Sequence, residues 1–98
     1  MVKHIFIAPI KEGVTDDQIE TRMKQMRDLM TYVPELKKLT VQKATGWLGV
    51  SDSVVLVAEL DTKEDWEKFI HNTYHVELGK SDGTYFKTDQ FVCTQIEY

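Results

Sequence analysis

The segment 54–60 (VVLVAEL) is the feature that most constrains the fold of this chain. Its β-branched and aliphatic residues predict a strand, and successive side chains of a strand point to opposite faces of the sheet. Both faces of this strand are apolar, so both faces of its sheet must be covered. A second strand is predicted at 2–10, with the residues of one face at even positions: Val2, His4, Phe6, Ala8 and Ile10. The opposite face of this strand carries Ile5 and Ile7.

Two segments predict amphipathic helices. The first begins near Thr15, because Thr15 and Gln18 have the spacing of a capping box. Its apolar residues then recur at helical spacing on one face: Ile19, Met23, Met26, Leu29 and Met30. The second begins after Thr62, another N-cap residue, and its buried side is predicted to hold Trp66, Phe69 and Ile70.

Two more strands are predicted at 36–44 and 91–98, and the segment 72–83 is either irregular or a short extra helix. The resulting order, β-α-β-β-α-β, is that of a ferredoxin-like α+β domain with a four-stranded antiparallel sheet. We expect one domain over residues 1–98. Two helices cover one face of such a sheet, and a chain of 98 residues has no further segment for the second face. The pattern therefore predicts a homodimer, in which the second copy covers that face.

Composition excludes several classes of partner. The net charge is -4, and lysines and arginines are scattered, which argues against nucleic-acid binding. No apolar run approaches the length of about 20 residues that a membrane helix needs. The N-terminus has no signal-peptide cleavage region. The single cysteine, Cys93, cannot form an internal disulfide and is predicted to be a small buried residue. We therefore expect a cytoplasmic protein that binds neither nucleic acid nor membrane.

Six short segments occur along the chain in a characteristic order: 2–5 (VKHI), 11–15 (KEGVT), 33–36 (VPEL), 60–65 (LDTKED), 71–76 (HNTYHV) and 97–98 (EY). Together they make the sequence resemble the Dabb family, the stress-responsive dimeric α/β-barrel domains. This resemblance implies a dimeric α/β barrel built from ferredoxin-like subunits.

The resemblance also implies a chemistry. A plant member of the family closes a linear polyketide by intramolecular aldol condensation without a cofactor, and a histidine of its His-Pro-x-His segment is the general base. His75 matches that histidine. The family member has an assisting tyrosine just upstream, where this chain reads Lys68-Phe69-Ile70. This chain also has one extra residue between the two histidines and no proline there. These differences weaken the case for polyketide cyclisation itself.

His75 and His4 are the candidate catalytic residues, because a free imidazole has a pKa near 6.5 and accepts a proton at neutral pH. Each also has a structural alternative: His4 as a hydrogen-bonded core residue, and His75 as a surface residue. His71 is expected at a helix end, where the helix dipole favours a cation. The three histidines form the only candidate metal set, without a HExxH motif or a cysteine cluster, so we expect no metal ion and no cofactor.

The candidate substrate-binding residues are those expected to line an apolar pocket between sheet and helices: Phe6, Ala8, Met26, Leu56, Trp66 and Tyr74. Tyr74 is either a hydrogen-bond donor to a developing oxyanion or a packing residue. Two functions remain open. The first is a cofactor-independent cyclase, lyase or isomerase acting on a small aromatic or polyketide-like molecule. The second is a non-catalytic small-molecule-binding or stress-response protein. An open cavity reached by both His4 and His75 favours the first.

Overall fold

The computed structural model describes all residues, 1–98, and contains four strands and five short-to-medium α-helices. In chain order these are β1 (Val2–Pro9), α1 (Asp16–Arg27), α2 (Leu29–Tyr32), β2 (Lys38–Lys43), β3 (Ser53–Leu60), α3 (Lys63–His71), α4 (Thr73–Gly79), α5 (Asp82–Tyr85), the 3-10 helix η1 (Thr88–Gln90) and β4 (Val92–Glu97).

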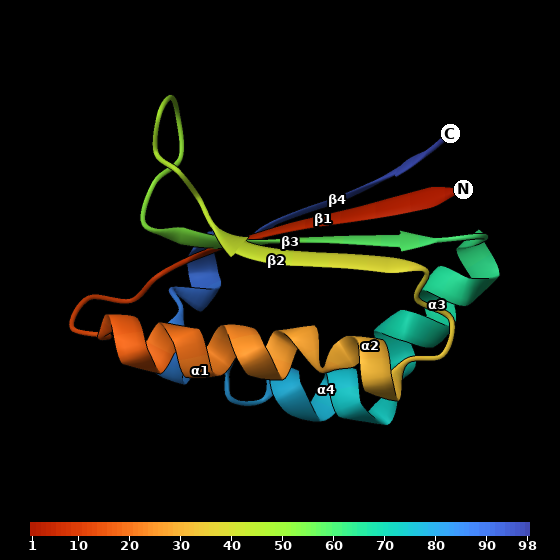
Figure 1. Cartoon of the computed structure of the whole chain (residues 1–98), viewed down its shortest axis with the longest axis horizontal. Coiled ribbons are helices and arrows are strands. Elements are labelled where there is room, and N and C mark those ends of the chain that lie inside the picture. The colour runs from red at the N-terminus through yellow and green to blue at the C-terminus, as the bar shows by residue number, and fades with distance from the viewer.

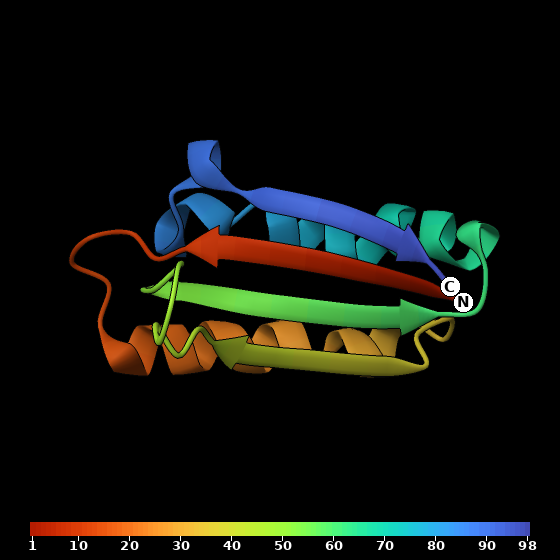
Figure 2. The same cartoon turned by 90° about the horizontal axis from the view of Figure 1, so that it is seen from above.

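All four strands form one antiparallel sheet in the order β2-β3-β1-β4. Helices α1 to α4 lie on one side of this sheet, and the other side carries no helix (Figure 1). Seen from above, α1 and α2 run behind the β2 and β3 edge, whereas α3 and α4 run behind β1 and β4 (Figure 2). The predicted ferredoxin-like arrangement is confirmed.

Local sequence signals start the two main helices where they were predicted. The Thr15 hydroxyl accepts a hydrogen bond from the Gln18 backbone N–H at 3.2 Å. The Gln18 side chain in turn accepts from the Thr15 N–H at 2.8 Å, which completes the capping box. Thr62 caps α3 by accepting from the Asp65 N–H at 3.1 Å. These caps satisfy backbone donors that have no partner in the first turn of a helix.

Met30 does not lie on the buried face that its helical spacing predicted. The prediction that Met30 faces the core is wrong, because Met30 is 43% exposed whereas Leu29 is 1% exposed. The helix is interrupted at Asp28, and α2 begins again at Leu29. Neighbouring helix residues point about 100° apart, so a turn that buries Leu29 directs Met30 outward.

The segment after α3 is helical rather than irregular. The Asn72 side chain accepts hydrogen bonds from the backbone N–H groups of Tyr74 and His75, at 2.9 and 3.3 Å, and so caps α4. The Asn72 amide also donates to the Tyr32 carbonyl at 3.0 Å, which ties α4 to the end of α2. Asn72 thereby fixes the orientation of the helix turn that carries His75.

The two faces of the sheet differ in what covers them. Ala8, Val54 and Ala58 are fully buried beneath the helices. On the opposite face, Ile7 and Val57 are only half-buried in the single chain. The loop between β2 and β3 rises on this opposite side (Figure 1), and it carries two strongly exposed apolar residues, Trp47 (89%) and Leu48 (97%).

Strand β4 is less buried than its sequence suggests. The prediction that Cys93 is buried is wrong, because Cys93 is exposed. The physical reason is its place on an edge strand: β4 pairs only with β1, and all six of its residues are exposed in the single chain. Its alternate side chains nevertheless reach the helix-covered face, where Cys93 lies opposite Phe6 and Gln95 lies opposite His4.

Candidate functional site

A pocket of about 230 Å³ lies between the sheet and the helices. Nine of its 13 lining residues are hydrophobic, the cysteine included, and the other four are two histidines, an aspartate and a glycine. The lining residues are His4, Phe6, Met26, Leu29, Leu56, Phe69, Ile70, His75, Leu78, Gly79, Asp82, Phe91 and Cys93. Ligand pockets for drug-sized molecules span roughly 300–1,000 Å³, so this volume suits a smaller molecule, such as one with a single aromatic ring.

His75 enters the pocket from the first turn of α4, where Asn72 holds the backbone. Its Nδ1 atom lies 2.9 Å from the Phe69 carbonyl oxygen. A carbonyl oxygen can only accept a hydrogen bond, so Nδ1 must carry the proton in this contact. In the neutral ring the proton is therefore absent from Nε2, and no group of the chain donates to that atom. This tautomer leaves the Nε2 lone pair as a proton acceptor.

His4 has the opposite arrangement. The indole N–H of Trp66 donates to His4 Nδ1 at 3.1 Å, and an indole nitrogen can only donate. The Gln95 amide nitrogen lies 3.2 Å from the same atom. Nδ1 therefore holds the lone pair, and the proton of the neutral ring is on Nε2, which lies 3.6 Å from Cys93 Sγ. His4 thus presents an N–H donor.

The charge state of His4 follows from its position. The side chain is 5% exposed. This burial lowers the pKa of His4 from 6.5 to about 4, and the neighbouring His75 acts in the same direction. Removing an imidazolium from water is costly, so the buried ring stays neutral at physiological pH. His4 consequently serves as a neutral hydrogen-bond donor and is a poor proton acceptor there.

The Phe69 ring sets the relation between the two histidines. It stacks on the His75 ring, with 4.4 Å between centroids and 14° between planes. It meets the His4 ring edge to face, with 5.4 Å between centroids. Phe69 is fully buried, so both imidazoles are held against a fixed apolar side chain. The arrangement combines a proton acceptor, a neutral N–H donor and an apolar wall.

The predicted site residues divide into two groups. His4, Phe6, Met26, Leu56 and His75 all line the pocket. The other three lie outside its lining. Ala8 is fully buried in the core. Trp66 contacts His4 instead of the pocket, and its indole N–H donates to His4 Nδ1. The Tyr74 hydroxyl donates to the Gln25 carbonyl at 2.8 Å, so this tyrosine links α4 to α1 and does not face the pocket.

Four residues of the pocket lining were not predicted from the sequence as pocket residues: Phe69, Phe91, Cys93 and Asp82. A local signal existed for Phe69, which falls on the buried side of α3. Nothing local marks Asp82, because its contacts come from residues about 60 positions away. His71 is exposed at the end of α3. No group of three or more histidine, cysteine, aspartate or glutamate side chains is placed to hold a metal ion.

Comparisons with solved structures reveal the same fold in several proteins. A protein from Arabidopsis thaliana superposes with a TM-score of 0.83 at 19% identity, covering 100% of this chain and 95% of that chain. A dimeric ferredoxin-like protein of unknown function from Thermobifida fusca has a TM-score of 0.83 at 21% identity, covering 99% and 90%. The hydroxynitrile lyase from Passiflora edulis has a TM-score of 0.81 at 16% identity, covering 97% and 90%.

At these identities the structural likeness shows the fold alone. No curated protein sequence matches this chain. None of its helices has the length and apolar character needed to cross a membrane. The model of the stress responsive A/B barrel domain matches residues 2–93, almost the whole sequence. The chain therefore belongs to the stress responsive A/B barrel (Dabb) family.

Proposed function

We propose that this protein is a cofactor-independent enzyme that transfers a proton on a small aromatic or polyketide-like molecule, as a cyclase, lyase or isomerase does. The observation that carries the proposal is the pairing of opposite imidazole tautomers in one apolar pocket. His75 offers a lone pair on Nε2 and His4 offers a proton on Nε2. Such a pair can remove a proton at one atom and stabilise negative charge at another.

The proposed step acts on a carbon next to a carbonyl group. His75 Nε2 accepts the proton of the carbon, and the electron pair of the broken C–H bond moves to the carbonyl oxygen. The resulting enolate oxygen accepts a hydrogen bond from His4 Nε2–H. The His75 imidazolium then returns its proton to the carbon. In a lyase reaction the enolate instead re-forms the carbonyl, a C=C bond forms as the bond from the neighbouring carbon to its leaving group breaks, and the imidazolium gives its proton to that group. His4 is suited to the donor role because burial keeps its pKa at about 4, so it remains neutral.

The surroundings favour this chemistry over storage of a ligand. A ligand that fills a mostly apolar pocket displaces water from it, which strengthens hydrogen bonds to a developing charge. The space between sheet and helices is open and both histidines reach it, the arrangement that the enzyme hypothesis requires. A lyase among the proteins of the same fold supports the same class of reaction.

We further propose that the working form is a homodimer paired through the open sheet faces. This face carries aliphatic residues on the three strands β1, β3 and β4: Ile5, Ile7, Val55, Val57, Val92 and Ile96. The β2–β3 loop rises on the same side (Figure 1), and it carries the strongly exposed Trp47 and Leu48. An apolar surface of this extent is typical of an interface, and the Thermobifida fusca protein of the same fold is dimeric.

Hydrogen exchange at an activated carbon tests the proposed step. The probe is 4-hydroxyacetophenone in D₂O, whose methyl protons lie next to a carbonyl and are followed by NMR. We expect the protein to accelerate their exchange, and His75→Ala to lose about 10²–10⁴-fold of that acceleration, as removal of a general base does. His71→Ala is the matched control, because His71 is exposed and outside the pocket; it should retain the activity. No exchange above the buffer rate, or equal rates in wild type and His75→Ala, would contradict the proposal.

A further inference from the structure

We propose that Asp82 is a second polar contact for the ligand and selects molecules that carry a hydrogen-bond donor, a hydroxyl or an amine, away from the carbonyl end. The inference rests on the proposed ligand pocket but not on proton transfer within it. Asp82 lines the same pocket as the two histidines. It begins α5, whose last residue, Tyr85, accepts a hydrogen bond from the Lys11 N–H, two residues after the end of β1. His4 lies near the opposite end of that strand.

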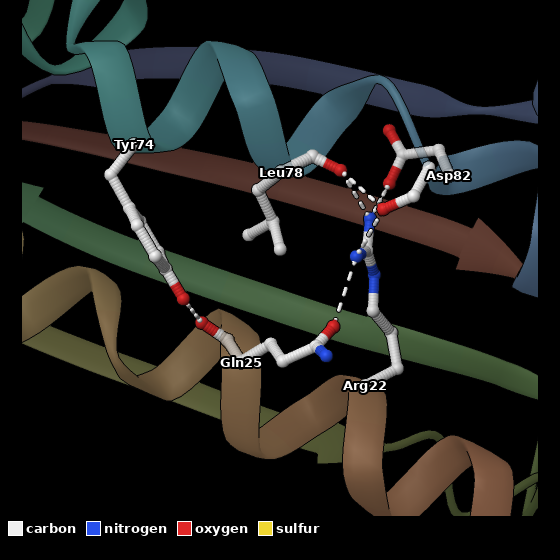
Figure 3. Close-up of polar contacts among 6 residues, drawn as sticks. Arg22, Gln25, Tyr74, Leu78 and Asp82 are labelled. Atoms are coloured by element: carbon white, nitrogen blue, oxygen red, sulfur yellow. Dashed lines mark hydrogen bonds and ion pairs between the residues drawn. The ribbon is translucent and has the colours of Figure 1, made fainter.

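A buried arginine fixes the Asp82 carboxylate. Arg22, 1% exposed, extends from α1 toward the start of α5 (Figure 3), and its Nη2 donates to Asp82 Oδ1 at 2.6 Å. The same guanidinium donates to the Leu78 carbonyl at 2.7 Å and to the Ser81 hydroxyl at 2.9 Å. Asp82 is the only acidic side chain that pairs with it. A buried guanidinium requires such a counter-charge, so the carboxylate is held in one position.

The second oxygen of Asp82 remains available. Arg22 occupies Oδ1, whereas Oδ2 has no hydrogen-bond partner in the chain. The side chain is 24% exposed, so it is not sealed in the core. Gly79, which also lines the pocket, lies beside Oδ2: a Cβ at this position would be 3.8 Å from that oxygen. The glycine therefore places no side chain next to the free oxygen.

A free carboxylate oxygen in a mostly apolar pocket is selective. It accepts a hydrogen bond and offers none, so a ligand hydroxyl or amine near it gains a charge-assisted bond. A ligand with a methyl group there leaves the carboxylate without water and without a partner, which is unfavourable. Together with the N–H of His4, this predicts a ligand with an acceptor at one end and a donor at the other.

Binding of two ketones of equal size tests this inference. The probes are 4-hydroxyacetophenone and 4-methylacetophenone, which differ by a hydroxyl in place of a methyl group, at a pH where the phenol is neutral. Calorimetry should show that wild type prefers the hydroxy compound by about tenfold or more. In Asp82→Asn, Arg22 keeps its hydrogen bond to the side-chain oxygen, so the NH₂ group takes the place of the free carboxylate oxygen. The preference should then fall several-fold, because the NH₂ group gives the phenol oxygen only a neutral hydrogen bond in place of the charge-assisted one.

Ser81→Ala is the matched control, since it removes another partner of Arg22 without altering the pocket lining; its preference should remain. A second measurement uses the wild-type protein alone and so does not depend on whether a variant folds. The ¹³C resonance of the Asp82 carboxyl group should shift with the hydroxy compound and not with the methyl compound. Equal affinities in wild type, an unchanged preference in Asp82→Asn, or an unshifted resonance would overturn the inference. Selective binding without hydrogen exchange would contradict the proposed proton transfer and leave the Asp82 assignment standing.

Discussion

The two faces of the sheet are built by the same strands but have different surroundings. On the covered face, β1 places His4 beside Phe69 and Trp66, at a pocket between the sheet and the helices. On the open face, the alternate residues Ile5 and Ile7 are only half-buried within the chain. A strand alternates strictly between its faces, so one sequence encodes both surfaces, and a slip of one residue would exchange them. The proposed chemistry is thereby confined to one side and the proposed subunit pairing to the other.

The same comparison explains where polar groups are tolerated. His4 is acceptable on the covered face because Trp66 and Gln95 supply donors to its Nδ1 atom. Buried polar groups without such partners are costly. The open face presents aliphatic side chains at the corresponding central positions, which suits a dry interface between two copies. A charge should therefore have very different effects on the two faces and on the helix surface.

The largest effect is expected from a charge at the centre of the open face. Ile7→Asp should dissociate or unfold the protein, because the proposed pairing would bring two unpaired carboxylates into one interface. Light scattering of wild type at micromolar concentration should give about twice the 11.4 kDa chain mass. Thr31→Asp, on the exposed surface of α2, introduces the same charge on the helix side and should remain dimeric. A monomeric wild type, or a dimer that survives Ile7→Asp, would refute pairing through this face.

A smaller effect is expected from acid on the covered face. Because the pKa of His4 falls from 6.5 to about 4 on folding, the unfolded chain binds the additional proton in this range. Stability should therefore decrease as the pH falls from about 6.5 to about 4, with a His4 contribution of about 3 kcal/mol. Below about pH 4 both states are protonated at this site, and its contribution levels off.

The contribution of His4 to the pH dependence of stability must be measured as a difference between wild type and a variant without this histidine, since carboxylates also titrate in that range. Urea unfolding at several pH values should give a shallower pH dependence for His4→Gln than for wild type. His71→Gln, at an exposed histidine, should follow the wild-type curve. Parallel curves for wild type and His4→Gln would mean that His4 is not held neutral by burial.

The smallest effect is expected where neither face is involved. Thr15→Ala removes one side of the capping box at the start of α1 and should cost about 0.5–2 kcal/mol. Thermal unfolding should reveal the loss, while the dimer mass and the hydrogen exchange of the probe ketone stay unchanged. An unaltered midpoint would mean that the cap contributes nothing to stability.

Sequence periodicity was sufficient to predict the fold because its signals are local. The Thr15 and Thr62 caps start both main helices, and the alternation in β1 placed His4 and Phe6 on one face. The resemblance to the Dabb family, not the alternation, assigned that face to the helices. The break at Asp28 was not predicted, so Met30 was placed on the wrong side. For β4, the exposure of Cys93 depends on which strand lies at the edge, a property that local sequence does not specify.

The site was predictable only in part. Asn72 is a standard N-cap residue, and with it the helix that carries His75 could have been recognised. Arg22 also gave a signal: it falls three residues after Ile19 and four before Met26, within the buried stripe of α1. A buried charged side chain requires a partner of opposite charge, but the spacing of apolar residues in α1 does not identify that partner. Asp82 is 60 residues away, and only the tertiary structure joins the two.

The tautomers of His4 and His75 are the most direct test of this account. The ¹⁵N chemical shifts of the imidazoles, measured by NMR at neutral pH, distinguish a protonated from an unprotonated ring nitrogen. We predict that His4 carries its proton on Nε2 and that His75 carries its proton on Nδ1, as the Trp66 and Phe69 hydrogen bonds require. A proton on Nε2 of His75, or an unprotonated Nε2 on His4, would contradict the assignment of base and donor on the covered face.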